Sequence, residues 1–251
     1  MKQIMILLKK DLIELFKTNK ALILGAIFII FSVGSPILAK FTPDILKSLG
    51  DEVQIVLPEP TTIDSYLQFH SNIVSMSLFA LIIIFGNIIA NEKTKGIYTD
   101  LVNNGVTKFN YIFAKIKSQA GIITLIYIIS VALFGICNYI LFEEFLIKYA
   151  IYSFISMYVY LIFVTVLVNF FSVIAKSNIM AIVLSFVSVF LLMFFELFKF
   201  GKCLPNHLAE ISTKILSDSK YLDHFYQNIF VTLALIILLI AGAIKFCKNK
   251  E

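Results

Sequence analysis

Six long apolar runs alternate with polar segments along this 251-residue chain. As a helix rising about 1.5 Å per residue, each run is long enough to cross the roughly 30 Å hydrocarbon core of a bilayer. The pattern therefore predicts an all-α polytopic membrane protein whose residues 1–251 form one transmembrane domain. The predicted spans are 21–39, 71–90, 121–141, 149–175, 179–198 and 229–246.

Residues 1–20 have a different pattern, because lysines and an aspartate separate apolar side chains that recur at helical spacing. Ile4, Leu8, Leu12, Leu15 and Phe16 mark the apolar side. A helix that is apolar on one side and basic on the other is typical of a segment lying in the membrane interface. We predict such an interfacial helix; the alternative is a direct extension of the first span.

Two longer polar segments precede the second and the sixth span. In the first, Thr62 or Asp64 is expected to cap the helix that continues into the second span. In the second, residues 208–216 predict a short amphipathic helix that rests on the membrane or re-enters it. At the end of the fifth span, Glu196 and Lys199 stand at helical spacing, which favours a structural ion pair over a functional carboxylate.

The composition agrees with a membrane protein and excludes several functions. Hydrophobic residues make up 59% of the chain and charged residues 15%, whereas soluble domains are about 25% charged. The chain contains no phosphate-binding Gly-x-x-x-x-Gly-Lys loop, no Gly-x-Ser-x-Gly elbow and no His-Glu-x-x-His zinc motif. We therefore expect no enzyme activity in this chain.

Cysteine and histidine spacing predicts neither a disulfide nor a metal site. Cys137, Cys203 and Cys247 fall in a span, an outer loop and the C-terminal segment, so no two share a compartment. His207 and His224 have no cysteine or second histidine at ligand spacing.

Lysines are distributed unevenly between the two sides that six spans define. With the N-terminus inside, 14 of the 21 lysines fall on the cytoplasmic side and 7 on the outer side, while the 16 acidic residues divide 5 to 11. Because cytoplasmic loops carry an excess of basic residues, we predict a cell-membrane protein with both termini in the cytoplasm. The long polar segment 91–117 between the second and third spans is then cytoplasmic too.

Segment 91–117 has features that predict a structured loop rather than a simple connection. Glu92 and Lys93 stand at the membrane exit, where they can anchor the chain. Gly96 allows a sharp turn, since glycine tolerates backbone conformations that other residues avoid. A short helix carrying Leu101 is expected to follow and to insert into a groove on a cytosolic partner.

Two groups of residues resemble one known family. The first approaches the second span: Glu59-Pro60-Thr61, Asp64, Gln68-Phe69 and Asn72. The second lies in the polar segment: Glu92-Lys93, Lys95-Gly96, Leu101, Gly105, Lys108 and Lys115. Both are similar to the membrane subunits of type-2 ABC exporters. That family also has six spans, an interfacial N-terminal helix, a cytoplasmic coupling helix between spans two and three, and a re-entrant outer region between spans five and six.

The chain departs from the family pattern at three places. Ile97 stands where threonine is usual, and Gly105-Val106 replaces a proline-containing turn found in many members. Lys108 stands for the usual arginine, and a lysine cannot make the fork of hydrogen bonds that an arginine makes.

The resemblance implies a permease subunit that moves an amphipathic or hydrophobic substrate, with a peptide favoured, out of the cytoplasm. A separate cytosolic ABC ATPase would bind ATP and Mg²⁺, and a second permease copy or paralogue would complete the complex within the lipid; no nucleic-acid partner is implied. The implied ATPase-coupling residues are Glu92, Lys93, Gly96, Asp100, Leu101, Gly105, Lys108 and Lys115.

Other functions stay open at this point. A lipid or small-drug efflux permease of the same type fits the pattern, as does a non-transporting membrane scaffold or sensor whose loop recruits a cytosolic partner. An ion-coupled carrier is disfavoured because the spans hold few ionisable residues. Polar residues within the spans are candidates for a substrate path, although helix packing and other structural roles are the favoured explanation for them. They are Asn72, Ser75, Asn87, Asn138 and Glu196.

Overall fold

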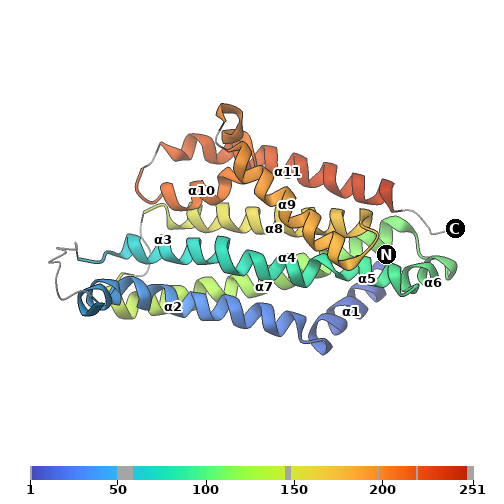
Figure 1. Ribbon diagram of the computed structural model, residues 1–251, viewed down its shortest axis with the longest axis horizontal. Coiled ribbons are helices and arrows are strands. Elements are labelled where there is room, and N and C mark those ends of the chain that lie inside the picture. Colours follow the sequence, from blue (N-terminus) through green and yellow to red (C-terminus); the bar gives the residue numbers. More distant parts are fainter. Residues whose placement is uncertain (1, 50–58, 145–147, 197, 219, 248–251) are drawn as a thin grey trace.

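The computed structural model describes residues 2–49, 59–144, 148–196, 198–218 and 220–247, and within these ranges it is all-helical, with no strand (Figure 1). In chain order the elements are α1 (Lys2–Lys17), α2 (Lys20–Leu49), α3 (Thr62–Asn72), the π-helical turn η1 (Ile73–Ser77), α4 (Leu78–Gly86), α5 (Ile88–Thr94), α6 (Ile97–Asn103), α7 (Lys108–Phe142), α8 (Ala150–Ile174), α9 (Asn178–Phe195), the 3₁₀ turn η2 (Lys199–Cys203), α10 (His207–Lys214) and α11 (Tyr221–Phe246).

Six of these helical stretches, among the described residues, are long and apolar enough to cross a membrane. This confirms the predicted number and order of spans. The second candidate, Thr62–Thr94, joins α3, η1, α4 and α5 into one stretch. The fold class is therefore an all-helical protein with six candidate membrane-spanning helices, which is compatible with a multi-pass membrane protein.

The ends of several helices lie outside the predicted spans. Helix α2 continues through Pro36 and Pro43 to Leu49, although hydropathy predicts that the first span ends at residue 39. Helix α7 already begins at Lys108 and α11 at Tyr221. Hydropathy places a helix end where polar residues begin, whereas the backbone stays helical as long as the polar side chains have room beside a neighbour or in solvent.

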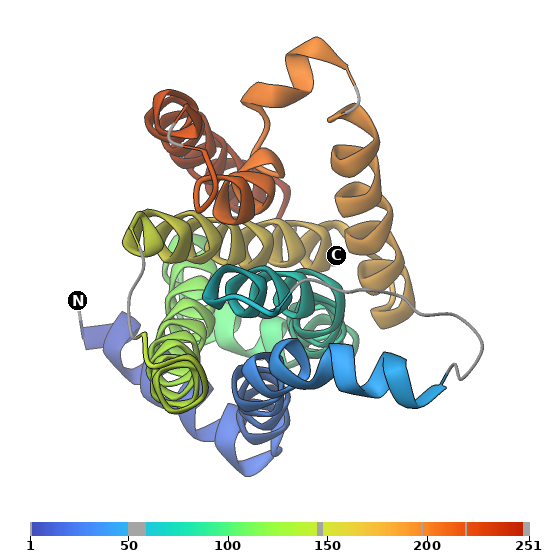
Figure 2. The same ribbon diagram turned by 90° about the vertical axis from the view of Figure 1, so that its left-hand side faces the viewer.

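Helix α8 lies at the centre of the bundle, where it packs against α4, α7, α9, α10 and α11. Figure 2 shows α11 on one side of α8 and α2, α4 and α7 on the other, with α9 beside both α8 and α4. Both termini lie at the end of the bundle that also holds α5 and α6, and the start of α3 and helix α10 lie toward the opposite end (Figure 1). The candidate sites are at these two ends.

Helix α1 is separate from α2 and lies at an angle to it (Figure 1). The break falls at Thr18 and Asn19, where Asn19 has a left-handed φ of 58°. The first span therefore does not extend directly into α1, and the position of α1 in a membrane interface stays a prediction.

A capping box starts the second candidate span. The hydroxyl of Thr61 accepts a hydrogen bond from the Asp64 backbone N–H at 3.4 Å, and the Asp64 carboxylate accepts one from the Thr61 N–H at 2.8 Å. The sequence pattern favours Thr62 or Asp64 as the cap; the cap is Thr61, one residue earlier, because only this position lets Asp64 return the hydrogen bond.

Replacing Thr61 with alanine is expected to lower the free energy of unfolding by about 1 kcal/mol, since the Asp64 backbone N–H loses its side-chain acceptor and keeps only the Thr61 carbonyl. Thermal unfolding of the detergent-solubilised chain measures the change. Thr42→Ala is the control, because the exposed Thr42 hydroxyl only donates to the Leu38 carbonyl within α2. Equal effects of the two substitutions would contradict a role for the cap.

Candidate functional site

A buried ion cluster lies at the end of the bundle that holds the two termini. Its centre is Glu92 of α5, whose side chain is 2% exposed. The Glu92 carboxylate accepts hydrogen bonds from Lys10 Nζ at 2.6 Å, Lys115 Nζ at 2.8 Å and the Tyr111 hydroxyl at 2.6 Å. Three donors on one carboxylate hold α1, α5 and α7 together.

Asp11 of α1 completes the cluster. It is 3% exposed and accepts a hydrogen bond from Lys115 Nζ at 2.7 Å, while Lys10 Nζ lies 3.6 Å from the same carboxylate. Glu14, one turn further along α1, lies 3.4 Å from Lys10 at the exposed edge. Lys115 is thus shared between carboxylates of two different helices.

Two lysines face the two buried carboxylates: Lys115 is itself buried, whereas Lys10 is 37% exposed at the edge of the cluster, and these pairings make the burial tolerable. Burial raises the pKa of the Asp11 carboxyl, and the nearby Lys115 offsets only part of this shift. Partial burial lowers the pKa of Lys10, but the ion pair with Glu92, together with Asp11, raises it on balance. Loss of one member would leave an unpaired charge inside the protein.

Directly after the cluster the chain turns into the short helix α6. Gly96 precedes α6 with a φ of 79°, a left-handed conformation that side chains disfavour. Lys93 fixes the approach to this turn, since its Nζ donates to the Val173 carbonyl of α8 at 2.5 Å and lies 5.8 Å from the centre of the Tyr98 ring. Gly105, with a φ of 83°, ends the connection on the other side.

Helix α6 has one face packed on the bundle and one face exposed. Leu101 and Val102 pack partly buried against the cluster of Tyr98 and Tyr111, and the insertion of Leu101 into a groove on a partner stays a prediction. The exposed residues of this helix are Ile97, Asp100 and Asn103, and Lys95 and Lys108 are exposed beside it.

The predicted coupling residues thus fall into three groups. Glu92 and Lys115 lie in the buried cluster, and Lys93, Gly96 and Gly105 shape the turns around α6. The remaining three lie on or beside α6, where Asp100 and Lys108 are exposed and Leu101 is partly buried. Sequence reasoning missed Asp11, Lys10 and Tyr111, which belong to the same cluster. The signal for Asp11 was its spacing of four residues from Leu7 and from Leu15, both of which are buried on the same side of α1.

The predicted substrate-path residues are not gathered in one place. Only Ser75 and Glu196 line a common cavity, of about 480 Å³, between α3, η1, α4, α8, α9 and α10. Asn72 donates to the Ser35 hydroxyl at 2.9 Å, Asn87 accepts from Lys20 at the break between α4 and α5, and Asn138 donates to the Glu144 carbonyl. These three asparagines tie helices or helix ends together.

Glu196 has other neighbours than the expected lysine. The side chain of Lys199 lies outside those that the structure describes. The Glu196 carboxylate lies 3.1 Å from His207 Nδ1 and accepts a hydrogen bond from Asn206 Nδ2 at 2.6 Å. The sequence shows no cysteine or second histidine at ligand spacing from His207. The structure nevertheless places His207 in a polar cluster at one end of the cavity. In the sequence, Glu210 follows His207 by three residues, and this helical spacing is the feature that could have indicated the cluster.

Comparisons with known proteins add no family assignment: no protein-family model matches the chain, and no curated protein matches it.

Proposed function

We propose that this chain is the permease subunit of an ATP-driven exporter, with α6 as the element that a separate ATPase moves. The observation that carries the proposal is the direct connection between α6 and the buried ion cluster. Gly96 is only four residues from Glu92 in sequence, and Glu92 is bonded to both α1 and α7. A displacement of α6 would therefore be transmitted to α5 and α7, which belong to two of the candidate spans.

The proposed orientation puts the end with α1, α6 and both termini in the cytoplasm, in agreement with the lysine count. The exposed face of α6 is then accessible to a cytosolic ABC ATPase that binds ATP and Mg²⁺. A second copy of this chain or a paralogue would complete the complex in the cell membrane.

The proposed cargo is an amphipathic or hydrophobic molecule, with a peptide favoured. The cavity between α4, α9 and α10 supports this choice, because its walls include Leu78, Phe186 and Phe190 and its polar end includes Glu196. An apolar wall with a few polar groups at one end is typical of sites for amphipathic ligands.

Co-expression with candidate ABC ATPases tests the proposal, with ATP hydrolysis measured in liposomes that contain both proteins. We expect a stable complex whose hydrolysis depends on the presence of this chain. Absence of a complex with every ABC ATPase of the same organism would contradict the function.

A charge reversal on α6 is expected to weaken ATPase binding. Asp100→Lys reverses the charge of an exposed side chain in the middle of the proposed docking face, and a reversed charge at an interface disrupts its electrostatic complementarity with the partner. We expect at least about a tenfold loss of affinity, measured by titration in nanodiscs, with an unchanged unfolding temperature. Glu144→Lys, the same change at an exposed position near the opposite end of α7, is the matched control. A loss of affinity in both variants, or in neither, would contradict docking at α6.

A further inference from the structure

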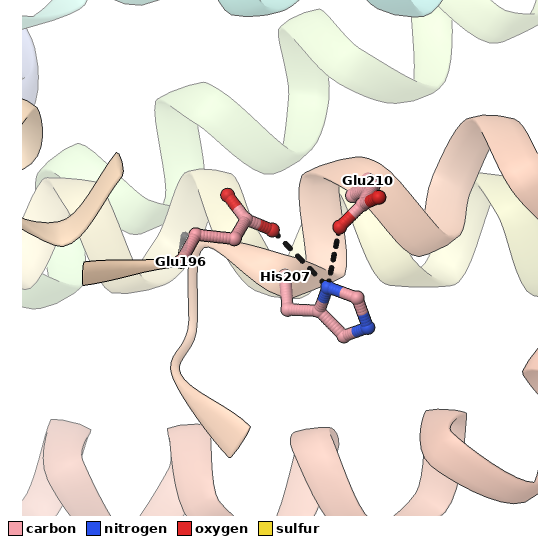
Figure 3. A group of neighbouring side chains, drawn as sticks. All are labelled: Glu196, His207 and Glu210. Carbon is pink, nitrogen blue, oxygen red and sulfur yellow. Dashed lines mark hydrogen bonds and ion pairs between the residues drawn. The ribbon is translucent and has the colours of Figure 1, made fainter. Parts of the chain in front are cut away.

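Three side chains that can bind a metal ion converge where α9 ends and α10 begins. His207 Nδ1 lies 3.1 Å from Glu196 Oε1 and 2.6 Å from Glu210 Oε2, as Figure 3 shows. The candidate ligand atoms of the three residues all lie within 4.8 Å of one another. The His207 side chain is 5% exposed, and those of Glu196 and Glu210 are 21% and 29% exposed.

The remaining polar atoms of the two carboxylates already have partners. Glu196 Oε2 accepts from Asn206 Nδ2 at 2.6 Å, and Asn206 Oδ1 in turn accepts from the buried Tyr160 hydroxyl at 2.8 Å. Glu210 Oε1 is ion-paired with Lys214. Outer partners of this kind orient ligating carboxylates in metal sites. They leave Glu196 Oε1, Glu210 Oε2 and His207 Nδ1 pointing toward one another.

One hydrogen on His207 faces two carboxylate oxygens. His207 Nδ1 carries at most one hydrogen, so it can donate to only one of the two carboxylate oxygens beside it at a time. Two carboxylates that share one site also repel each other. A cation at the centre would take the place of this hydrogen and bind all three atoms at once.

The spacing fits a small divalent cation. With bonds of about 2.0–2.1 Å, the ligands of tetrahedral Zn²⁺ lie about 3.3 Å apart. The two separations from Nδ1, 2.6 and 3.1 Å, are slightly shorter, so small rotations of the two carboxylates would open the site to this size. One nitrogen and two carboxylate oxygens form a ligand set that Zn²⁺ accepts, with a fourth position left open.

A buried histidine with one unpartnered ring nitrogen also lines the cavity beside the cluster. Glu196, Asn206 and Glu210 line the cavity of about 480 Å³, and so does His70 of α3. His70 is fully buried; its Nε2 lies 2.7 Å from the Ser153 hydroxyl, whereas its Nδ1 has no hydrogen-bond partner among the described residues. An unsatisfied buried nitrogen beside a cavity indicates that the cavity takes a polar ligand or water.

We propose that Glu196, His207 and Glu210 form a binding site for a divalent cation at the polar end of this cavity, with Zn²⁺ as the favoured ion. The bound ion would link the end of α9 to α10 and would present its open position toward the cavity. The other acidic group, Asp11, Glu14 and Glu92, is no comparable site because Lys10 and Lys115 already neutralise it. Cation binding at this site does not depend on the transport function.

Calorimetric titration of Zn²⁺ into the purified chain in nanodiscs, without any ATPase, tests the site. We expect saturable binding of one ion per chain at micromolar Zn²⁺. Glu196→Gln and His207→Gln are each expected to weaken binding at least about tenfold. Glu144→Gln, an exposed acid near the opposite end of α7 from Lys108, is the control and should bind as the unmodified chain does.

Two further measurements distinguish cation binding at this site from binding elsewhere in the chain. Co²⁺ bound by nitrogen and oxygen should give a spectrum without a thiolate charge-transfer band, and such a band would instead assign the binding to a cysteine and overturn the proposal. Zn²⁺ should raise the unfolding temperature of the unmodified chain but not of the two ligand variants. Absence of saturable binding, or equal affinity in Glu196→Gln, would also overturn it.

Discussion

Replacing Glu92 with glutamine is expected to lower the free energy of unfolding by about 3–5 kcal/mol, the cost of breaking a buried ion pair by removing one partner. The substitution preserves the shape of the side chain but removes its charge. Lys10 and Lys115 would then share the single buried carboxylate of Asp11. The excess positive charge sits where α1, α5 and α7 meet, so these helices should separate first.

The fraction of monodisperse protein that remains after heating measures this loss. Glu14→Gln is the matched control, because Glu14 pairs with the same Lys10 at 3.4 Å but its side chain is 39% exposed. Such an exposed pair contributes at most about 1 kcal/mol. If Glu92→Gln were no more destabilising than Glu14→Gln, the cluster would not hold the three helices together.

A second large effect is expected from Gly96→Val, and it concerns coupling more than stability. Gly96 has a φ of 79°, and no atom lies within 4 Å of the place that a Cβ would take, so the substitution causes backbone strain without a clash. A β-branched residue in this conformation costs about 1–3 kcal/mol. The chain can relieve that strain by changing the direction in which α6 leaves α5, and the proposed ATPase contact would then be misaligned.

We expect ATP hydrolysis that depends on this chain to fall at least about tenfold in Gly96→Val, while the unfolding temperature falls only modestly. Hydrolysis in liposomes and thermal unfolding are measured on the same preparation. Gly121→Ala is the control, since Gly121 lies within α7 and a Cβ added there would also meet open space. Retained coupling in Gly96→Val would show that the direction of α6 is unimportant.

The six candidate spans could be predicted because each carries an unbroken apolar run, which is a local property of the sequence. The positions of the helix ends could not be predicted in this way. Tyr66, Phe69 and His70 are fully buried in α3, yet the polar residues between them place this segment before the apolar run, so the sequence predicts here only a capped helix that leads into the span. Hydropathy therefore predicts the start of the second span at residue 71, although the capped helix begins at Thr62.

The ion cluster was predictable only in part, because its members are far apart in sequence. Glu92 stands out as a charge at the end of an apolar run, but 82 residues separate it from Lys10. The periodicity of α1 places Asp11 with the lysines on its polar side, whereas the packed helix buries Asp11 and leaves Phe16 46% exposed. Only the pairing of α1 with α7 decides which side faces inward.

The π-helical turn at Ile73–Ser77 affects how the cavity end of the second candidate span is rotated relative to the end at the ion cluster. A π-turn accommodates one extra residue in an otherwise α-helical stretch, and one residue corresponds to a rotation of about 100°. Conversion of this turn to regular α-helix would swivel His70 and Ser71 away from the cavity while Glu92 kept its bonds. The π-turn therefore sets how His70 and Ser71 are rotated relative to Glu92 along the helix from Thr62 to Thr94.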